Sequence, residues 1–333
     1  MIELLGDKIR AKKTAAALGI AGIPGAEIDP ADPAGAERAA SELGYPVILK
    51  AASGGGGKGM RIVGKEGELP ALLPLAVSEA EAAFGDGTVY LEKYFTNPRH
   101  VEVQLLALPG GETAVLGERD CTVQFSHQKL IEESPSPGIG EKLRGKMYRT
   151  AEKLFREIGY SGAGTVEFLV AGGKCFFMEV NARLQVEHPV TEMLTGVDLV
   201  RQQILAAGES RLETSGVIAP RVGYALECRI NAAGPGTVKQ FIAPGGLGVR
   251  VDTHLYPGAK VPPHYDPLLA KIIVAGRDRP EGIARMRRAL AELVIEGVAT
   301  NLDLQKEIVA GKVFGRGDFG TATFDSLLRE DKQ

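Results

Sequence analysis

The chain has 333 residues, of which 44% are hydrophobic and 24% charged, a composition typical of a globular protein of about two domains. Thirty-nine basic residues against 42 acidic ones give a net charge of −3, which argues against a protein held to nucleic acid by bulk charge. The three cysteines are far apart and form no Cys-x-x-Cys pair, so we expect no zinc site and a reducing, cytoplasmic location.

The first hundred residues predict a small module of helices and strands. The N-terminus lacks the basic and apolar regions of a signal peptide, and no later apolar stretch approaches the length of a membrane span. Residues 7–18 instead predict a helix, and residues 33–43 predict a second one, with Asp32 as its N-cap and Gly44 as its end. Strands at 45–50 and 60–63, a helix at 72–84 and a strand at 89–94 follow.

A glycine tract joins the two short strands: Ser53-Gly54-Gly55-Gly56-Gly57-Lys58-Gly59. It is neither a P-loop nor a dinucleotide-binding turn, because no helix follows it and Gly-Lys-Ser/Thr is absent. Its backbone N–H groups could wrap phosphate oxygens, since glycine has no Cβ to block their approach, and Lys50 and Lys58 would add positive charge. The alternative is a flexible hairpin tip with a solvated lysine.

The rest of the chain alternates strands with amphipathic helices. Strands are expected at 101–108 and 113–119, a helix at 141–158, and a hairpin at 164–170 and 174–181. The other expected elements are helices from Val190 and at 198–207, 281–293, 302–310 and 322–328, and strands at 224–230 and 269–274. Antiparallel runs of strands separated by helices favour an α+β fold over a doubly wound parallel sheet.

Two carboxylates of the expected hairpin suggest a metal site. If the hairpin is centred on Gly173, Glu167 lies opposite Glu179, and Asn181 shares the face of Glu179 because strand side chains alternate. Two carboxylates and an amide oxygen would suit Mg²⁺, which prefers oxygen ligands. A register shifted by one residue would place Glu167 on the other face, and a polar, solvent-facing hairpin is the alternative interpretation.

Two further polar segments could carry chemistry. After Asn181, Arg183 could hold a small anion and Glu187 could act as a general base, or the segment could simply lead into a helix that starts at Pro189. Arg229, on a predicted strand, is either an ion-paired structural residue or an anion holder. A polar cluster after the strand at 113–119 could contact a nucleotide or form an exposed loop. Its members are Gln124, His127, Gln128 and Lys129.

Together these segments resemble the biotin carboxylase family, in the same order and over nearly the whole chain. The glycine tract with the strand before it resembles the family's ATP-binding lid, and the run from Glu179 to Gly196 is close to a family signature. The other matching segments are Glu92-Lys93-Tyr94, Asn97-Pro98-Arg99-His100-Val101-Glu102, Glu118-Arg119-Asp120-Cys121, Glu227-Cys228-Arg229-Ile230-Asn231-Ala232, Ala243-Pro244-Gly245-Gly246 and Tyr265-Asp266-Pro267.

The resemblance implies an ATP-grasp fold with the nucleotide between a glycine-loop lid and a larger antiparallel-sheet domain. It divides the chain into an N-terminal helix (1–22), a lid subdomain (23–95), a catalytic core (96–212) and a C-terminal region (213–333). The implied reaction activates bicarbonate with ATP as carboxyphosphate, which then carboxylates biotin. The implied cofactors are ATP and Mg²⁺, with Mn²⁺ as a substitute, and biotin is a carried substrate. The implied partners are a biotin carboxyl carrier protein or domain and a carboxyltransferase subunit.

The resemblance also assigns roles to individual residues. The residues implied to bind nucleotide are Lys8, Lys50, Gly56, Gly57, Glu92, Lys93, Tyr94, Phe95, His100, Gln124 and His127. Those implied to bind bicarbonate are Lys129, Arg183, Gln185 and Val186, and those implied to bind metal are Glu167, Glu179 and Asn181. Glu187 would deprotonate bicarbonate, and Arg229 would stabilise the biotin enolate. A carboxylate base beside cations suits this chemistry, because bicarbonate is a poor nucleophile until it loses a proton.

The sequence departs from the family pattern at three places. The family usually begins with a further Rossmann-like domain before the segment that matches Gly6-Asp7-Lys8; a separate chain could supply this domain, or the sequence could be truncated. Phe125-Ser126 stands where two arginines are usual, and the loop after Asn231 is shorter. The alternatives are therefore a catalytically silent ATP-binding module of a carboxylase assembly, or another ATP-grasp ligase.

Overall fold

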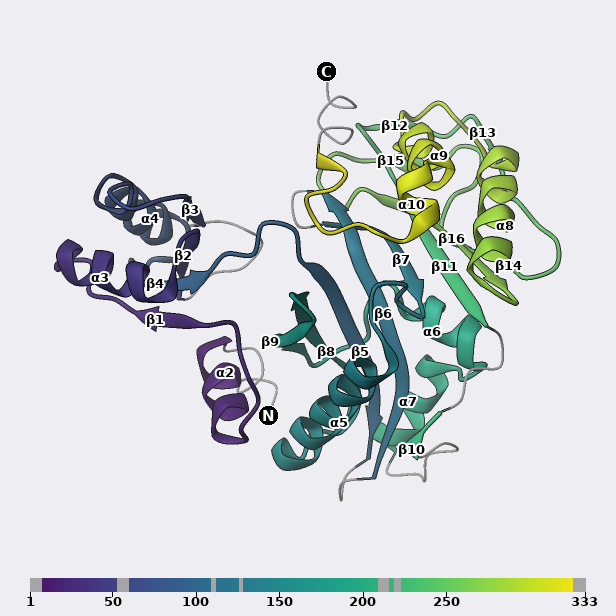
Figure 1. Cartoon of the computed structure of the whole chain (residues 1–333). Helices are drawn as coiled ribbons and strands as arrows, with labels where there is room; N and C mark the ends of the chain where they lie inside the picture. Colours follow the sequence, from purple (N-terminus) through teal and green to yellow (C-terminus); the bar gives the residue numbers. More distant parts are fainter. Residues whose placement is uncertain are drawn as a thin grey trace. The chain divides into compact units, whose positions relative to one another are not determined.

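The structure, a computed structural model, describes residues 8–52, 60–108, 112–125, 128–208, 216–218 and 223–325. The chain forms two compact units, one of Met1–Pro98 with Glu167–Val180 and one of Arg99–Val166 with Asn181–Gln333 (Figure 1). Helices combined with mostly antiparallel strands confirm the predicted α+β fold.

The first unit contains an antiparallel sheet with the strand order β1-β4-β2-β3. Helices α3 and α4 pack on it and bury alanine and leucine side chains against the strands. The elements of this unit are α2 (Lys8–Ala17), β1 (Gly25–Glu27), α3 (Pro33–Leu43), β2 (Val47–Ala51), β3 (Arg61–Val63), α4 (Leu69–Phe84) and β4 (Val89–Lys93).

Local signals explain both helices. The Asp32 carboxylate accepts a hydrogen bond from the Gly35 N–H at 2.9 Å, and Gly44 ends α3 with a φ of 74°, as predicted from the sequence. Helix α4 begins earlier than predicted, at Leu69. There the carboxylate of Glu68, just before the helix, accepts hydrogen bonds from the backbone N–H groups of Gly64 and Lys65.

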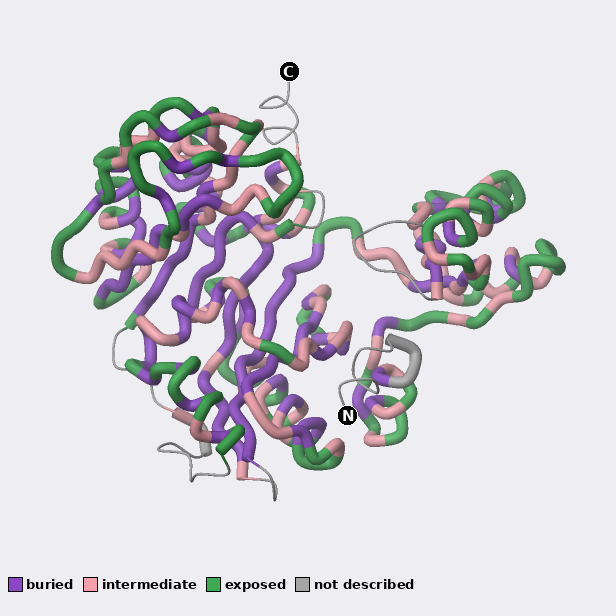
Figure 2. Tube along the Cα trace, turned by 180° about the vertical axis from the view of Figure 1, so that it is seen from behind, coloured by how far each residue is buried: buried purple, intermediate pink, exposed green. Residues whose placement is uncertain are grey.

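The large sheet has the strand order β14-β16-β11-β7-β6-β5-β8-β9, and β10 pairs with β6 in parallel. Its central strands are buried along most of their length (Figure 2). The strands are β5 (Arg99–Ala107), β6 (Thr113–Phe125), β7 (Gln128–Ser134), β8 (Gly162–Ala171), β9 (Lys174–Asn181), β10 (Gly216–Val217), β11 (Tyr224–Asn231), β14 (Val249–Thr253) and β16 (Leu268–Gly276).

The second unit also contains helices and two small strand pairs. The strand pairs are β12 (Gly236–Thr237) with β15 (Lys260–Val261) and β13 (Gln240–Ile242) with β17 (Val294–Glu296). The helices are α5 (Glu141–Ile158), α6 (His188–Thr195), α7 (Leu199–Ala207), α8 (Arg279–Glu292), α9 (Leu302–Ala310) and α10 (Lys312–Arg316). Among the described residues, each helix is too short or too polar to cross a bilayer.

The structure differs from the sequence predictions for this unit in several places. The strand predicted at 113–119 runs on to Phe125, and strand β7, which contains Gln128 and Lys129 of the polar cluster, was not predicted. The two apolar residues of β7, Leu130 and Ile131, are adjacent, and two glutamates follow them, so no alternating pattern revealed a strand. The helix α10 was not predicted at all. Of the helix predicted at 322–328, residues 322–324 form a turn, Asp325 is helical, and residues from 326 onward lie outside the described part, so most of this prediction stays untested.

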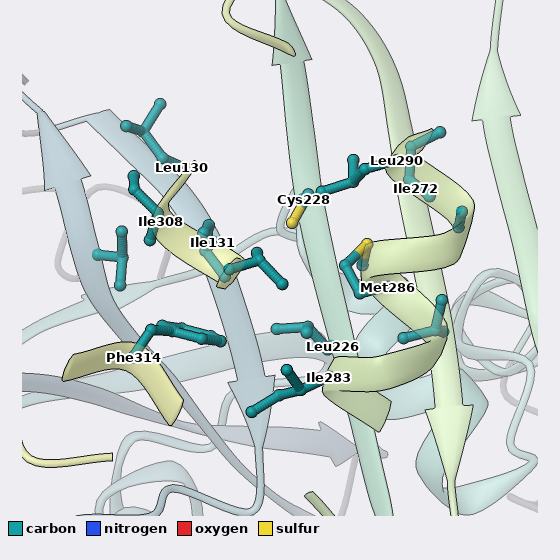
Figure 3. Close-up of a cluster of buried hydrophobic side chains, with 14 of the residues drawn as sticks. Leu130, Ile131, Leu226, Cys228, Ile272, Ile283, Met286, Leu290, Ile308 and Phe314 are labelled. Carbon is teal, nitrogen blue, oxygen red and sulfur yellow. The ribbon is translucent and has the colours of Figure 1, made fainter. Parts of the chain in front are cut away.

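The largest apolar core lies between strands β7, β11 and β16 and the helices α8, α9 and α10 (Figure 3). From β11, Leu226 and Cys228 point into this core, where Ile283 and Met286 of α8 and Phe314 of α10 meet them. Because successive strand side chains point to opposite faces, Glu227 and Arg229 of β11 face away from this core. Helix α8 thus packs on the apolar face of the sheet, and the charged residues of β11 lie on the opposite face.

Candidate active site

Charged side chains gather on the face of the large sheet opposite α8, where α6 packs. They come from neighbouring strands and from the residue just before α6, and ion pairs join them into one cluster. Its members are Glu102 on β5, Arg119 on β6, Lys129 and Glu132 on β7, Glu187 before α6 and Arg229 on β11. All of these residues belong to the second unit.

Glu187 lies between two cations. Its side chain is 1% exposed, and its Oε1 lies 2.6 Å from the Lys129 Nζ while its Oε2 lies 2.8 Å from the Arg229 Nη2. Burying a carboxylate is costly unless it is paired, and here each oxygen has its own cationic partner. The arrangement holds a potential proton acceptor in one orientation beside two positive charges.

Each cation also contacts a second buried carboxylate. The Lys129 Nζ lies 2.8 Å from Glu102 Oε2, and the Arg229 guanidinium lies 2.6 Å from Glu132 Oε1. Both of these carboxylates are fully buried. Lys129 and Arg229 are therefore held from two sides, which limits the rotation of their long side chains.

Arg119 fastens α6 to the sheet. Its fully buried guanidinium donates to Glu102 Oε1 at 2.7 Å, to Gln104 Oε1 at 2.8 Å and to the Thr191 hydroxyl on α6 at 2.7 Å. Because Glu187 immediately precedes α6, this anchor fixes the position of Glu187 relative to the strands. The residues Glu102, Arg119 and Glu132 were missed as site residues, and the available signal was the presence of charged residues inside otherwise apolar strands.

Burial and neighbouring charges act on the ionisation of this cluster. Burial raises the pKa of Glu132 above its ordinary value, although the Arg229 guanidinium works in the opposite direction. Burial lowers the pKa of Arg229, but Glu132 and Glu187 outweigh this effect and hold the pKa above its ordinary value. Arg229 therefore remains a cation throughout the physiological pH range.

The segment after β9 presents an exposed arginine. In the described part of the chain, the Arg183 guanidinium contacts only the Leu184 carbonyl oxygen and the Gln185 Oε1, both at 3.3 Å. Gln185 is buried, and the Val186 carbonyl oxygen accepts a hydrogen bond from the Lys271 Nζ at 2.9 Å. Arg183 is thus a cation that no carboxylate of the described residues neutralises.

In the first unit, two lysines share one buried carboxylate. The Glu92 side chain is 2% exposed and pairs with the Lys50 Nζ at 2.5 Å and with Lys12 of α2. Burial raises the pKa of Glu92, but the two ammonium groups outweigh this effect and hold it below its ordinary value. Lys12 was not predicted from the sequence, because nothing local marks a lysine of a helix as a partner for a strand residue.

The other residues predicted to bind nucleotide are distributed over both units. In the first unit, the Lys93 Nζ donates to the Gly44 carbonyl oxygen at 2.6 Å, the Tyr94 N–H donates to the Pro46 carbonyl oxygen at 3.1 Å, and the Phe95 ring stacks on Phe176 at 4.9 Å. In the second unit, His100 is buried and its Nδ1 lies 3.4 Å from Gln124 Nε2. The backbone of Lys8 lies in α2, but its side chain is outside the described part of the structure. Gly56, Gly57 and His127 also lie outside the described residues.

The predicted metal ligands lie on the β8–β9 hairpin. Glu167 on β8 is buried, while Glu179 and Asn181 on β9 are half-buried. The turn consists of Gly172 and Gly173, both with positive φ, so the hairpin axis lies between them rather than at Gly173. With regular pairing on both strands, Glu167 would lie opposite Met178, so a shared face for the two carboxylates requires a bulge. The metal assignment stays a prediction.

Family models match most of the chain. The model described as carbamoyl-phosphate synthase L chain, ATP binding domain, matches residues 7–215, and the model described as biotin carboxylase C-terminal domain matches residues 227–326. The chain is 48% identical to a biotin carboxylase of Pseudomonas aeruginosa, over 100% of this chain and 76% of that protein. It is 47% identical to a biotin carboxylase of Allochromatium vinosum, over 98% of this chain and 75% of that protein.

Solved structures agree with these relatives. The biotin carboxylase of Campylobacter jejuni in complex with βγ-ATP has a TM-score of 0.92 and 42% identity, over 98% of this chain and 74% of that chain. The biotin carboxylase domain of the Hydrogenobacter thermophilus 2-oxoglutarate carboxylase, bound to MgADP, ADP and bicarbonate, has a TM-score of 0.91 and 41% identity, with the same coverage.

Proposed function

The chain belongs to the biotin carboxylase family, whose fold is the ATP-grasp fold, and we propose that it is a ligase that carboxylates biotin with ATP and bicarbonate. The reaction would proceed through carboxyphosphate, and the biotin would be carried on a carrier protein or domain. The observation that carries the proposal is Glu187, held between Lys129 and Arg229.

Glu187 would take the proton from bicarbonate. A carboxylate can serve as a general base when it lies within hydrogen-bond reach of the proton, and the two cations beside Glu187 would stabilise the negative charge that builds up on the attacking oxygen. Lys129 and the exposed Arg183 would hold the anion, together with Gln185 and Val186. Arg229 would then stabilise the enolate that biotin forms when its ureido nitrogen is deprotonated.

The lysines of the first unit would bind the nucleotide. Lys12 and Lys50 both pair with the single carboxylate of Glu92, so the three side chains carry a net charge of about +1. This group could therefore bind the negatively charged phosphate chain of a nucleotide. The glycine tract at 53–59 would supply backbone N–H groups to the phosphates. Exclusion of water from the site would matter because carboxyphosphate is destroyed by water.

The donor set of the β8–β9 hairpin fits Mg²⁺. Glu167, Glu179 and Asn181 offer two carboxylates and an amide, the hard oxygen ligands that Mg²⁺ shares with substrate phosphates. When bound, Mg²⁺ neutralises phosphate charge during phosphoryl transfer.

The family works in carboxylase assemblies, and we propose that this chain also acts together with a biotin carrier and a carboxyltransferase. A biotin carrier protein or domain would bring biotin to the site, and a carboxyltransferase subunit would pass the carboxyl group on. A cytoplasmic location fits the three buried free cysteines.

The test is ATP hydrolysis measured with and without bicarbonate and free biotin. Hydrolysis that needs bicarbonate and rises with biotin is the expected result. ATP binding without turnover would replace the proposal with a silent nucleotide-binding module. Hydrolysis that is indifferent to bicarbonate would point to another ATP-grasp ligase.

A further inference from the structure

Two buried carboxylates lie next to each other behind Arg229. Glu227 on β11 and Glu132 on β7 are directly opposite each other in the antiparallel register, and both are fully buried. Directly opposite residues of an antiparallel pair have their Cβ atoms about 4.5–5.5 Å apart, on the same face of the sheet. Two carboxyl groups therefore occupy one small, dry volume.

Three oxygens of this pair have no hydrogen-bond partner among the described residues. They are both oxygens of Glu227 and the Oε2 of Glu132. The other oxygen of Glu132 accepts from the Arg229 Nε at 2.6 Å. A buried carboxylate oxygen without a donor destabilises the folded state, so three such oxygens in two adjacent side chains need an explanation.

We propose that Glu132 and Glu227 hold one proton between them at neutral pH, with Glu227 as the acid, and that this pair positions Arg229 for the reaction. The O–H of Glu227 donates to the unpartnered oxygen of Glu132, which leaves Glu132 ionised toward the guanidinium. Two close carboxylates that share one proton avoid the repulsion of two adjacent negative charges. This inference rests on the proposed function only for the role of Arg229.

The surrounding charges support the placement of the proton on Glu227. Burial raises the pKa of Glu227 well above its ordinary value and Glu132 raises it further, against the opposing effects of Lys271 and Arg229. The charged groups that face Glu227 are Glu132 on β7, Arg229 on β11, Lys271 on β16 and Glu187 before α6. His188 and Glu192 of α6 and Arg250 and Asp252 of β14 lie beyond them.

A neutral Glu227 matters for the direction in which Arg229 points. The guanidinium now spans Glu132 and Glu187, with one carboxylate on each side. A third negative charge at Glu227 would attract the guanidinium toward the sheet and compete with Glu187 for it. The shared proton removes this competition, so Arg229 stays directed at the proposed base and at the position of the substrate.

The pH dependence of the free energy of unfolding tests directly whether Glu227 keeps a proton in the folded state. Urea unfolding is measured from about pH 6 to pH 8.5 for the wild type and for Glu227→Gln, in which an amide replaces the neutral acid. In the wild type, the native state keeps a proton that the unfolded state releases, so stability falls as the pH rises. We expect the folding constant of the wild type, relative to Glu227→Gln, to fall about tenfold per pH unit.

If the free energy of unfolding changed with pH in the same way for the wild type and for Glu227→Gln, the proposal would be overturned. Glu296→Gln, at an exposed carboxylate on β17, is the control and should run parallel to the wild type. Because this measurement needs no turnover, it remains decisive even if the chain proves inactive, in which case only the proposed function fails.

A separate measurement, of biotin-dependent ATP hydrolysis, tests whether the Glu132–Glu227 pair positions Arg229. In Glu132→Gln the guanidinium loses its ionised partner on the β7 side, so the biotin-dependent part of ATP hydrolysis should fall at least tenfold more than the biotin-independent part. A purely structural defect would lower both parts equally, and that outcome would refute the positioning role.

Discussion

Replacing Glu187 by glutamine removes the proposed base while keeping the shape of the side chain. Positioned general bases contribute roughly 10²–10⁴-fold to a rate, so bicarbonate-dependent ATP hydrolysis should fall by about that factor. At about 1.36 kcal/mol per tenfold change, this loss corresponds to about 3–5 kcal/mol of transition-state stabilisation.

The same change should cost much less in stability. Breaking a buried ion pair typically costs about 3–5 kcal/mol because it leaves a charge without a partner. Here Lys129 still has Glu102 at 2.8 Å and Arg229 still has Glu132 at 2.6 Å. We therefore expect the free energy of unfolding to fall by only about 1–2 kcal/mol.

The assay combines three measurements on Glu187→Gln: ATP hydrolysis with saturating bicarbonate, ATP affinity and urea unfolding. ATP affinity should stay within a few-fold of the wild type, because the Glu187 side chain pairs with Lys129 and Arg229, neither of which we assign to the nucleotide. Glu118→Gln is the matched control, since Glu118 is an equally buried carboxylate that pairs with Arg144 of α5 at 2.8 Å instead. The control should lose stability but not turnover. If Glu187→Gln retained more than about a tenth of the wild-type rate, the base assignment would be refuted.

Three further predictions follow from other parts of the structure. Arg183→Ala should raise the bicarbonate KM at least tenfold yet change the free energy of unfolding by less than about 0.5 kcal/mol, since the side chain is exposed; steady-state kinetics and unfolding together check this, and an unchanged KM would contradict it. Glu92→Gln should flatten the loss of stability in acid, because the pKa of Glu92 is held below its ordinary value of roughly 4.3 and the paired carboxylate stabilises the fold only until it is protonated; identical acid unfolding curves for variant and wild type would refute the pairing. Phe314→Ala should destabilise the protein by about 3–5 kcal/mol in urea unfolding, because the ring is fully buried and stacks on Phe319 at 5.6 Å; a loss below about 1 kcal/mol would show that the core is not packed as described.

Elements with strong local signals were predictable. The helix α3 has the predicted bounds because Asp32, Pro33 and Gly44 act on backbone groups within a few residues of themselves. The helix α5 likewise spans Glu141–Ile158, as predicted from its amphipathic pattern. The strand β7 was missed because its charged residues are buried by partners on other strands, which no local pattern reveals.

The sequence by itself determined the fold class, the family resemblance and the residue types of the site, since these depend on periodicity, on capping and on short motifs. Only the tertiary structure decided that Lys129, Glu187 and Arg229 meet, although they are 58 and 42 residues apart along the chain. It also decided that Glu132 and Glu227 face each other with three oxygens that no donor of the described residues reaches. The physical reason is that the free energy of a buried charge depends on the side chains next to it on neighbouring strands. The register of the strands and the packing of α6 determine which side chains these are.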